Sequence, residues 1–309
     1  MTGFSVTFGN VLLTLLYLLP GFLLCRFRKV RPEHLSSFGT VLLYACGPCL
    51  FLNSMTNLDP SPELTGKMLQ CLILSFLAQL LLLLLLYVLI GKRSSEFRWR
   101  MLAIAGVSGN AGFFGLPIIS ALFPGDPEVA AYSCVFCVSL NILAWTVGVF
   151  TLTGDRKYIS LRAAFVNPTV IAVVIGFVLY LLRAKEWLPD LLRNGIRTMS
   201  GMSTPLCLIG LGIRLAAMDL KKLFTQPFVY AIAAAKLILF PLFCFALANL
   251  LPYSPVFRAS MLILGATPCA SVILSLAEMH NSGQELAANC ALLSTLLSVI
   301  TIPLLSLLI

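Results

Sequence analysis

Two long apolar segments of this chain are interrupted by glycine and proline, and they occupy corresponding places in its two halves. The first interruption is Gly-Val-Ser-Gly-Asn-Ala-Gly-Phe-Phe-Gly-Leu-Pro at residues 106–117, and the second is Gly-Ala-Thr-Pro-Cys-Ala-Ser at 265–271. A uniform helix inside lipid does not tolerate such segments unless other protein groups satisfy the backbone. Paired interrupted spans are the best sequence indicator of the substrate site of a secondary transporter.

The composition is that of an integral membrane protein. Hydrophobic residues make up 59% of the chain and charged residues only 11%, whereas a soluble globular domain carries about 25% charged residues. The formal net charge of +9 would suggest nucleic acid in a soluble protein. Here the basic residues lie in short connections between apolar runs, so membrane topology explains the charge more simply, and no nucleic-acid partner is expected.

The apolar stretches predict ten membrane spans. Their ranges are 4–25, 35–56, 65–90, 100–123, 128–152, 165–183, 188–213, 224–250, 256–277 and 285–308. Fourteen of the 21 lysines and arginines lie in the odd-numbered connections and six in the even-numbered ones. Because basic residues stay on the cytoplasmic side, we expect a multi-pass protein of the cell membrane with both termini outside. The four basic residues of the loop at 183–197 run against this pattern.

The two halves, 1–155 and 156–309, are predicted to be structural repeats of five spans each. An offset of 157 residues places Pro48 on Pro205, and the same offset places the first interruption on the second. Because five spans is an odd number, the second copy must insert upside down. The alternative is chance, since prolines are common in membrane helices.

Each interruption starts a new half-helix, whose first backbone N–H groups lack partners and carry a partial positive charge. Pro117 and Pro268 are expected in the first turn of these half-helices, where no N–H is needed. Two such N-termini that converge near the membrane midplane predict a site for an anion, above all a carboxylate. The alternative is a simple proline kink, which Gly109, Gly112 and Gly115 make less attractive for the first interruption.

Polar side chains near the interruptions are the candidate substrate ligands. Thr267, Ser271, Ser275 and Glu278 follow one another at steps of four, four and three residues. This spacing predicts that they lie on one face of a helix. The stripe has an alternative interpretation, because Ser and Thr also bond back to carbonyls of their own helix. Two amides, Asn110 in the first interruption and Asn141 deep in the fifth span, need partners at that depth.

Lys236 is the most deeply placed formal charge. It lies about 12 residues, or roughly 18 Å, into the eighth span, which is too deep for easy snorkelling. A charge there costs at least about 2.5–3.5 kcal/mol and marks function by default. Lys236 is therefore expected to be a counter-charge for the anion or the partner of a helix C-terminus. No Asp or Glu lies near the centre of a span, which argues against a proton relay and weakens sodium coupling.

Two cysteine pairs resemble reactive motifs but lie in apolar surroundings. The sequence Cys-Gly-Pro-Cys at 46–49 matches a thioredoxin active site, whose chemistry requires an accessible helix N-terminus. Cys134 and Cys137 have no histidine nearby to complete a metal site. We interpret both pairs as packing residues. No catalytic constellation is recognisable, so neither an enzyme, a metal site nor a cofactor is predicted.

Five segments spread over the whole chain form a recognisable set. They are Ser-Gly-Asn-Ala-Gly-Phe-Phe-Gly-Leu-Pro at 108–117, Asn-Pro at 167–168, Pro-Leu-Cys-Leu-Ile-Gly-Leu-Gly at 205–212, and the segments 266–278 and 292–303. With this set the chain resembles the auxin efflux carrier family, and more closely its short bacterial members of the malonate- or malate-permease type.

The resemblance implies ten helices in two inverted five-helix repeats, with broken helices four and nine crossing each other. It implies a scaffold of spans 1, 2, 6 and 7 and a transport domain of spans 3–5 and 8–10 that moves like an elevator. In plant relatives a dimer forms through the scaffold, so a homodimer is a possible partner arrangement here. By position in the motifs, Asn110 matches the crossover asparagine and Asn141 a polar residue that faces the substrate. Asn53 matches the scaffold side of the site more loosely.

One departure from the plant carriers limits what the resemblance implies. The connection between spans five and six is only residues 154–161, whereas plant members have a long hydrophilic loop. Specificity for indole-acetate therefore does not carry over, and the expected substrate is a small organic anion. The alternatives are a sodium-coupled symporter of a related ten-helix type and, less favoured, a polytopic membrane enzyme.

Overall fold

The computed structural model describes residues 3–90, 93, 96–280 and 283–309, apart from the side chains of residues 220–222. Throughout the described residues the secondary structure is helical, and the single β feature is an isolated antiparallel bridge between Gly109 and Cys269. This confirms the predicted all-α class.

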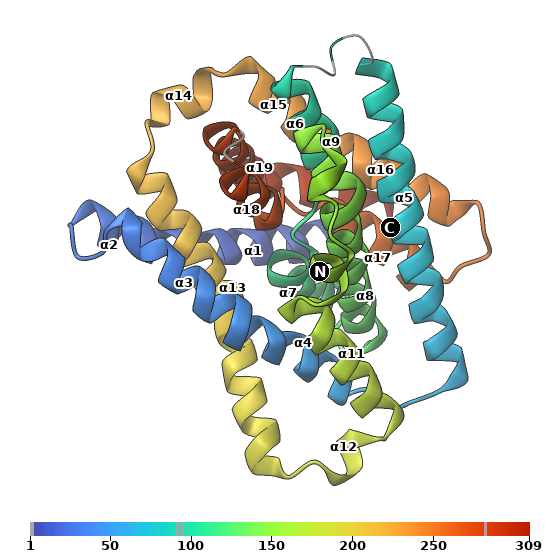
Figure 1. Cartoon of the computed structure of the whole chain (residues 1–309). Coiled ribbons are helices and arrows are strands. Elements are labelled where there is room, and N and C mark those ends of the chain that lie inside the picture. Colours follow the sequence, from blue (N-terminus) through green and yellow to red (C-terminus); the bar gives the residue numbers. More distant parts are fainter. Residues whose placement is uncertain (1–2, 91–92, 94–95, 281–282) are drawn as a thin grey trace.

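The helices follow one another along the chain with short connections (Figure 1). The first half contains α1 (Gly3–Leu16), α2 (Leu18–Arg26), η1 (Pro32–His34), α3 (Leu35–Val41), η2 (Leu42–Cys46), α4 (Gly47–Thr56), α5 (Pro62–Ile90), α6 (Phe97–Ala105), η4 (Ala111–Gly115), α7 (Leu116–Leu122), α8 (Glu128–Leu143), η5 (Ala144–Gly148) and α9 (Val149–Thr153). The second half contains η6 (Arg156–Tyr158), α10 (Leu161–Phe165), α11 (Pro168–Leu181), α12 (Ala184–Trp187), α13 (Asp190–Ala217), α14 (Leu220–Thr225), α15 (Pro227–Ala234), η7 (Ala235–Leu239), α16 (Phe240–Asn249), α17 (Pro255–Gly265), α18 (Ser271–Met279), α19 (Gln284–Leu305) and η8 (Ser306–Leu308).

Seven helical runs among the described residues are long and apolar enough to cross a membrane. They are Gly3–Arg26, Pro32–Thr56, Pro62–Ile90, Glu128–Thr153, Asp190–Ala217, Pro227–Asn249 and Gln284–Leu308. Three shorter apolar helices are Ala111–Leu122, Pro168–Leu181 and Pro255–Gly265. All of them fall within or close to the ranges predicted as spans. In the predicted span 165–183, α11 begins at Pro168, because the short helix α10 ends at Phe165 and residues 166–167 separate the two.

Three of the wide π-helical turns lie directly before prolines. The turns η2, η4 and η7 end two residues before Pro48, Pro117 and Pro241 respectively. A proline lacks the N–H of the regular ladder, and its ring collides with the carbonyl four residues earlier. Widening the preceding turn relieves that collision while the helix continues.

Contacts between the helices define two packing groups, which meet where α8 packs on α4 and α11. The helices α2, α4, α11 and α13 pack on one another, while α5 packs on α8 and α16, and α16 packs on α17. Within the first group, Gly21 and Gly212 let the backbones of α2 and α13 touch, because a Cβ at either glycine would collide with a carbonyl of the other helix. The helix α1 packs on both α19 and α7, and α17 of the second group packs on the same two helices, so the first span also meets the neighbours of the second group.

Candidate functional site

The two interruptions meet each other inside the protein. Residues 106–110 separate α6 from η4, and residues 266–270 separate α17 from α18. The backbone N–H of Asn110 donates to the carbonyl of Pro268 across 2.9 Å, and that of Ala270 donates to Ser108 across 3.0 Å. Each interruption therefore supplies hydrogen-bond partners that the other lacks, as non-helical backbone at membrane depth requires.

Two glycines make this close crossing possible. A Cβ at Gly109 would lie 2.5 Å from Thr267 Oγ1 and 2.9 Å from Lys236 Nζ, and a Cβ at Gly115 would lie 2.8 Å from Thr267 Cγ2. Real Cβ atoms do not approach other atoms this closely. Glycine is therefore required at these two positions, because any side chain would collide with Thr267 of the second interruption.

Neither proline occupies the position that the sequence predicted. Pro117 is the second residue of α7, but α7 continues the half-helix that begins with the five residues of η4, so this proline lies past the first turn of the half-helix. Pro268 lies in the non-helical segment before α18. The half-helices begin instead after Asn110 and Ala270. The prediction was wrong because a widened turn accommodates Pro117 inside a continuing helix, while Pro268 serves through its carbonyl as a hydrogen-bond acceptor.

A small cavity of about 180 Å³ opens beside the crossing. We call it the crossing cavity; its lining residues are Leu43, Phe51, Gly109, Asn110, Ala111, Gly112, Phe113, Cys137, Leu140, Asn141, Trp145, Asn167, Pro168, Thr169, Ala270, Ser271, Val272 and Ser275. It brings together three of the predicted ligands, Asn110, Asn141 and Ser271. None of the lining residues carries a formal charge, so any ion that binds here is held by amides, hydroxyls and backbone groups.

The two predicted asparagines already use part of their hydrogen-bonding capacity. The Asn110 side chain caps η4, because its Oδ1 accepts from the N–H of Phe113 across 3.3 Å. The Asn110 amide nitrogen lies 3.8 Å from the sulfur of Cys207. The Asn141 amide nitrogen donates to the carbonyl of Cys137 across 2.8 Å.

The N-terminus of α18 is open to the cavity. Its N-cap residue is Ala270, which has no side-chain oxygen and makes no capping bond. Ala270, Ser271 and Val272 all line the crossing cavity. The N–H groups of a helix's first turn lack intrahelical acceptors, and they attract anions. The helix that starts at Ala111 is capped by its own asparagine, so α18 offers the better anion site of the two.

Three predicted ligands lie elsewhere. Thr267 is fully buried in the interruption itself, where its hydroxyl donates to the carbonyl of Leu264 across 2.7 Å, so it does not share a helical face with Ser271 and Ser275. Lys236 is fully buried behind the crossing. Asn53 lines a separate cavity of about 210 Å³ together with Ser54, Asn57 and Ser120.

The lining of the crossing cavity also includes residues that the sequence did not single out as ligands, among them Trp145, Asn167 and Thr169. Asn167 caps α11 through its Oδ1, which accepts from Val170 across 3.0 Å. The Asn-Pro dipeptide at 167–168 is a helix-start signal in the middle of an apolar run. This dipeptide was the sequence signal for the start of α11, which lies beside the cavity.

A larger cavity of about 640 Å³ adjoins the first and shares Leu43, Phe113, Ser271 and Ser275 with it. We call it the vestibule; it lies between α3 and α13 on one side and α18 on the other, and it reaches Glu33, Arg214 and Glu278. Arg214 on α13 and Glu278 on α18 form an ion pair across it at 3.2 Å. The vestibule gives the crossing cavity a path to one surface of the protein.

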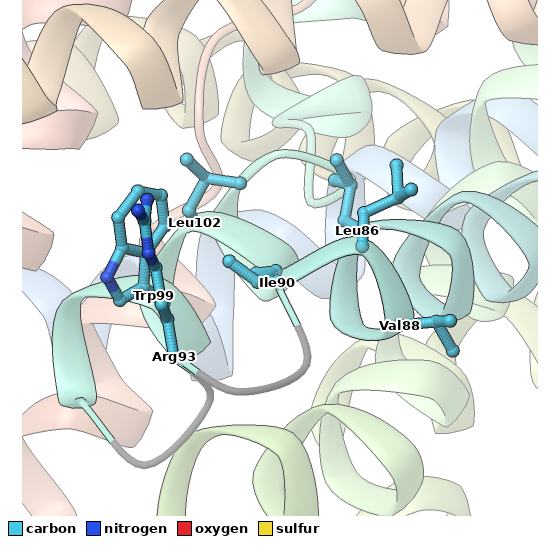
Figure 2. A pocket seen from close by; sticks show the side chains of 7 residues that line it. Leu86, Val88, Ile90, Arg93, Trp99 and Leu102 are labelled. Carbon is cyan, nitrogen blue, oxygen red and sulfur yellow. The ribbon is translucent and has the colours of Figure 1, made fainter.

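A further, mostly apolar groove lies away from the crossing, where α5 ends and α6 begins (Figure 2). It is lined by leucines, Val88 and Ile90 together with Arg93 and Trp99, and the Arg93 guanidinium lies 5.3 Å from the centre of the indole ring. A stacked arginine and tryptophan beside exposed aliphatic side chains are typical of the membrane interface. The groove shares no lining residue with the crossing cavity.

The cysteines are packing residues in this fold. All ten are free, and Cys46, Cys134 and Cys137 are buried. Among the described residues, no group of three or more His, Cys, Asp or Glu side chains is placed to hold a metal ion.

Comparison with known proteins decides the family. A family model described as "Membrane transport protein" matches residues 6–162 and 157–306. The chain belongs to this family. The match confirms the resemblance to the auxin efflux carriers that the motifs at 108–117 and 266–278 indicated, and it identifies the chain as a multi-pass membrane transporter.

Relatives of this membrane transport protein are similar over nearly their whole length. A protein of Rhizobium meliloti (strain 1021) named "Putative malonate transporter" is 26% identical over 296 residues, which cover 91% of this chain and 89% of the relative. An uncharacterized transporter of Methanocaldococcus jannaschii is 24% identical over 304 residues, covering 95% and 96%. The family and these relatives are transporters, which confirms the prediction of a transporter and not an enzyme.

Proposed function

We propose that this chain is a secondary transporter that carries a small organic anion, a carboxylate, across the cell membrane by an elevator-type alternating-access movement. The observation that carries the proposal is the uncapped N-terminus of α18, which opens into a cavity lined by Asn110 and Asn141. A carboxylate there would accept from the first-turn N–H groups and from the amides. The small volume of the cavity, about 180 Å³, suits a short-chain acid.

The name of the Rhizobium relative points to the same class of substrate. Malonate is a small dicarboxylate, and the printed name of that protein is a putative malonate transporter. The crossing cavity has no cationic side chain to hold a second carboxylate. In the adjoining vestibule, Arg214 is the cationic side chain that could meet the second carboxylate of a longer acid.

The ten-span inverted repeat is part of this proposal. The offset of 157 residues that relates the halves also separates Cys46 and Ser203, and the Ser203 hydroxyl donates to the carbonyl of Cys46 across 2.8 Å. A direct contact between equivalent positions is expected close to the pseudo-two-fold axis of an inverted repeat. The antiparallel bridge between the two interruptions also lies where such an axis would pass.

The elevator movement would separate the two packing groups of the fold. Spans 1, 2, 6 and 7 would form the scaffold, and spans 3–5 and 8–10 the transport domain. The vestibule supports this division, because it runs between α13 and α18, which would belong to different domains. With the basic connections on the cytoplasmic side, as the positive-inside rule predicts, the mouth of the vestibule would face the cytoplasm, as in an inward-open state. The packing of α1 on α19 would have to slide or rearrange.

Uptake into proteoliposomes tests the proposal. Purified protein would be reconstituted and supplied with labelled malonate, malate and indole-acetate, with and without ion gradients. We expect saturable uptake of one of the short acids, and competition by unlabelled acid of the same class. Protein that is inserted and folded, yet takes up none of the three, would contradict the assignment of a carboxylate substrate while leaving the family unchanged.

A further inference from the structure

Lys236 lies directly behind the crossing and is fully buried. It is the second residue of the widened turn η7, and its ammonium group donates to the carbonyl of Gly265. The same ammonium lies 4.5 Å from the centre of the Phe240 ring. A Cβ on Gly109 would lie 2.9 Å from its nitrogen, so the ammonium fills the space against the first interruption as well.

No carboxylate balances this charge in the part of the chain that the structure describes. The buried polar and charged side chains include Lys236 but no Asp or Glu. The ammonium is instead placed at a helix end, because Gly265 is the last residue of α17. The final carbonyls of a helix lack intrahelical donors and carry about half a negative charge. The lysine thus compensates the C-terminus of one half-helix, while the N-terminus of the next remains open to the crossing cavity.

Lys236 is separated from the substrate side of the crossing. It does not line the crossing cavity, whereas Gly109 does, and its nitrogen lies on the side of Gly109 that faces Thr267. This placement favours the second of the two roles expected from the sequence, the partner of a helix C-terminus. A role as a direct ligand of the anion would require the crossing itself to open.

Carbonyls at the C-terminal ends of broken half-helices have a recurrent use in secondary transporters, where they coordinate the coupling Na⁺ or H⁺. In this chain the carbonyl of Gly265, at the C-terminal end of α17, is bonded to the lysine ammonium. We propose that Lys236 is a positioning residue whose ammonium takes the place of a coupling metal cation at the crossing, so that anion transport by this chain does not require Na⁺. The inference rests on the proposed function and specifies its coupling.

The residue that corresponds to Lys236 in the first half of the proposed repeat is also polar and buried. The offset of 157 residues relates Lys236 to Gln79 on α5, which is also fully buried. Gln79 donates to the hydroxyl of Ser139 across 3.1 Å, and its amide oxygen has no hydrogen-bond partner. Both positions related by this offset therefore carry a buried polar side chain, and only the one in the second half carries a positive charge.

The test compares cation dependence in wild-type protein and in variants at position 236. Wild-type proteoliposomes would be assayed in Na⁺ and in choline media. Lys236→Met keeps the length of the side chain without its charge, and Lys236→Ala leaves room for a small cation beside the Gly265 carbonyl. Methylammonium fits that space and donates hydrogen bonds, whereas tetramethylammonium is larger and has no N–H to donate. Gly66→Ala is the control, because a Cβ at Gly66 meets nothing within 4 Å.

We expect equal wild-type uptake in both media, and a loss of about tenfold or more in Lys236→Met, since a buried charge and its partners act together. Uptake by Lys236→Ala should recover with methylammonium and not with tetramethylammonium. Wild-type uptake that requires Na⁺, or full activity of Lys236→Met in choline, would overturn the inference while leaving anion transport established.

Thermal unfolding of the purified proteins gives a readout that does not depend on transport. A ligand that binds only the folded state raises its melting temperature. We expect methylammonium to raise the melting temperature of Lys236→Ala and to leave that of wild type unchanged, with Na⁺ having no effect on wild type. Stabilisation of wild type by Na⁺ would contradict the inference even if no transported anion were found.

Discussion

The backbone N–H of Asn110 donates to the carbonyl oxygen of Pro268 across 2.9 Å, and this bond joins residues from the two interrupted segments. Asn110 is at the same time the N-cap of η4 and a wall of the crossing cavity. A single residue thus links the crossing of the chain, the start of a half-helix and the candidate substrate site. Substitutions that separate these roles give the most informative tests.

Replacing Asn110 by aspartate should separate helix capping from anion binding. Aspartate caps a helix as well as asparagine, so Asn110→Asp should keep a melting temperature close to wild type. The new negative charge in a cavity without cationic side chains should reduce uptake of an organic anion by about tenfold or more. Uptake and thermal unfolding of the same preparation check this. Wild-type uptake by Asn110→Asp would remove Asn110 from the site.

Replacing Ala270 by aspartate should fill the anion site from within. The new carboxylate can accept from the first-turn N–H groups of α18, and an N-cap of this kind stabilises a helix by about 0.5–2 kcal/mol. We expect Ala270→Asp to unfold at a temperature equal to or above that of wild type and to lose anion uptake. Ala270→Gly, which adds no acceptor, serves as the matched control and should retain uptake. Undiminished uptake by Ala270→Asp would show that the N-terminus of α18 does not hold the substrate.

Replacing Gly109 by alanine should disturb the crossing itself. The added methyl group would lie 2.5 Å from Thr267 Oγ1, and overpacking of this kind costs about 1–3 kcal/mol. We expect a lower melting temperature together with reduced uptake. Gly66→Ala, in open space on α5, should be neutral or slightly stabilising because alanine favours a helix over glycine. Equal behaviour of the two variants would contradict the close crossing.

The ion pair between Arg214 and Glu278 should favour the state in which the vestibule is open. It spans α13 and α18, and a partly exposed pair of this kind contributes up to about 1 kcal/mol. Glu278→Gln should therefore shift the equilibrium between states by up to about fivefold. A cysteine placed at Ser275, which lines the vestibule, should then react more slowly with a thiol reagent added from the cytoplasmic side. Unchanged labelling would contradict a link between this pair and the transport movement.

The sequence located the helices well because apolar runs and charged connections are direct consequences of the bilayer. The ends of α5, of the run Glu128–Thr153 and of α19 lie within a few residues of the predicted span ends. Glycine and proline likewise marked both interruptions, since few other residues permit a break in lipid. These features depend on the composition of short segments, so the sequence alone is sufficient to predict them.

The parts that the sequence did not predict depend on contacts between distant segments. Thr267 and Ser271 are four residues apart, but a helical face requires a helix, and the crossing removes the helix between them. Pro117 suggested a helix start, whereas a widened turn absorbs it. The sequence allowed two roles for Lys236, and the hydrogen bond from its ammonium to the Gly265 carbonyl favours the role of a partner for a helix C-terminus. In each case the structure depends on contacts with residues far away in the sequence, which local composition does not reveal.

A structure determined with the transported acid bound tests the central claim most directly. The account predicts the carboxylate at the N-terminus of α18, within hydrogen-bonding distance of the Ser271 and Val272 N–H groups, with the amide of Asn110 or Asn141 beside it. A carboxylate bound to the Lys236 ammonium, or in the separate cavity at Asn53, would contradict it.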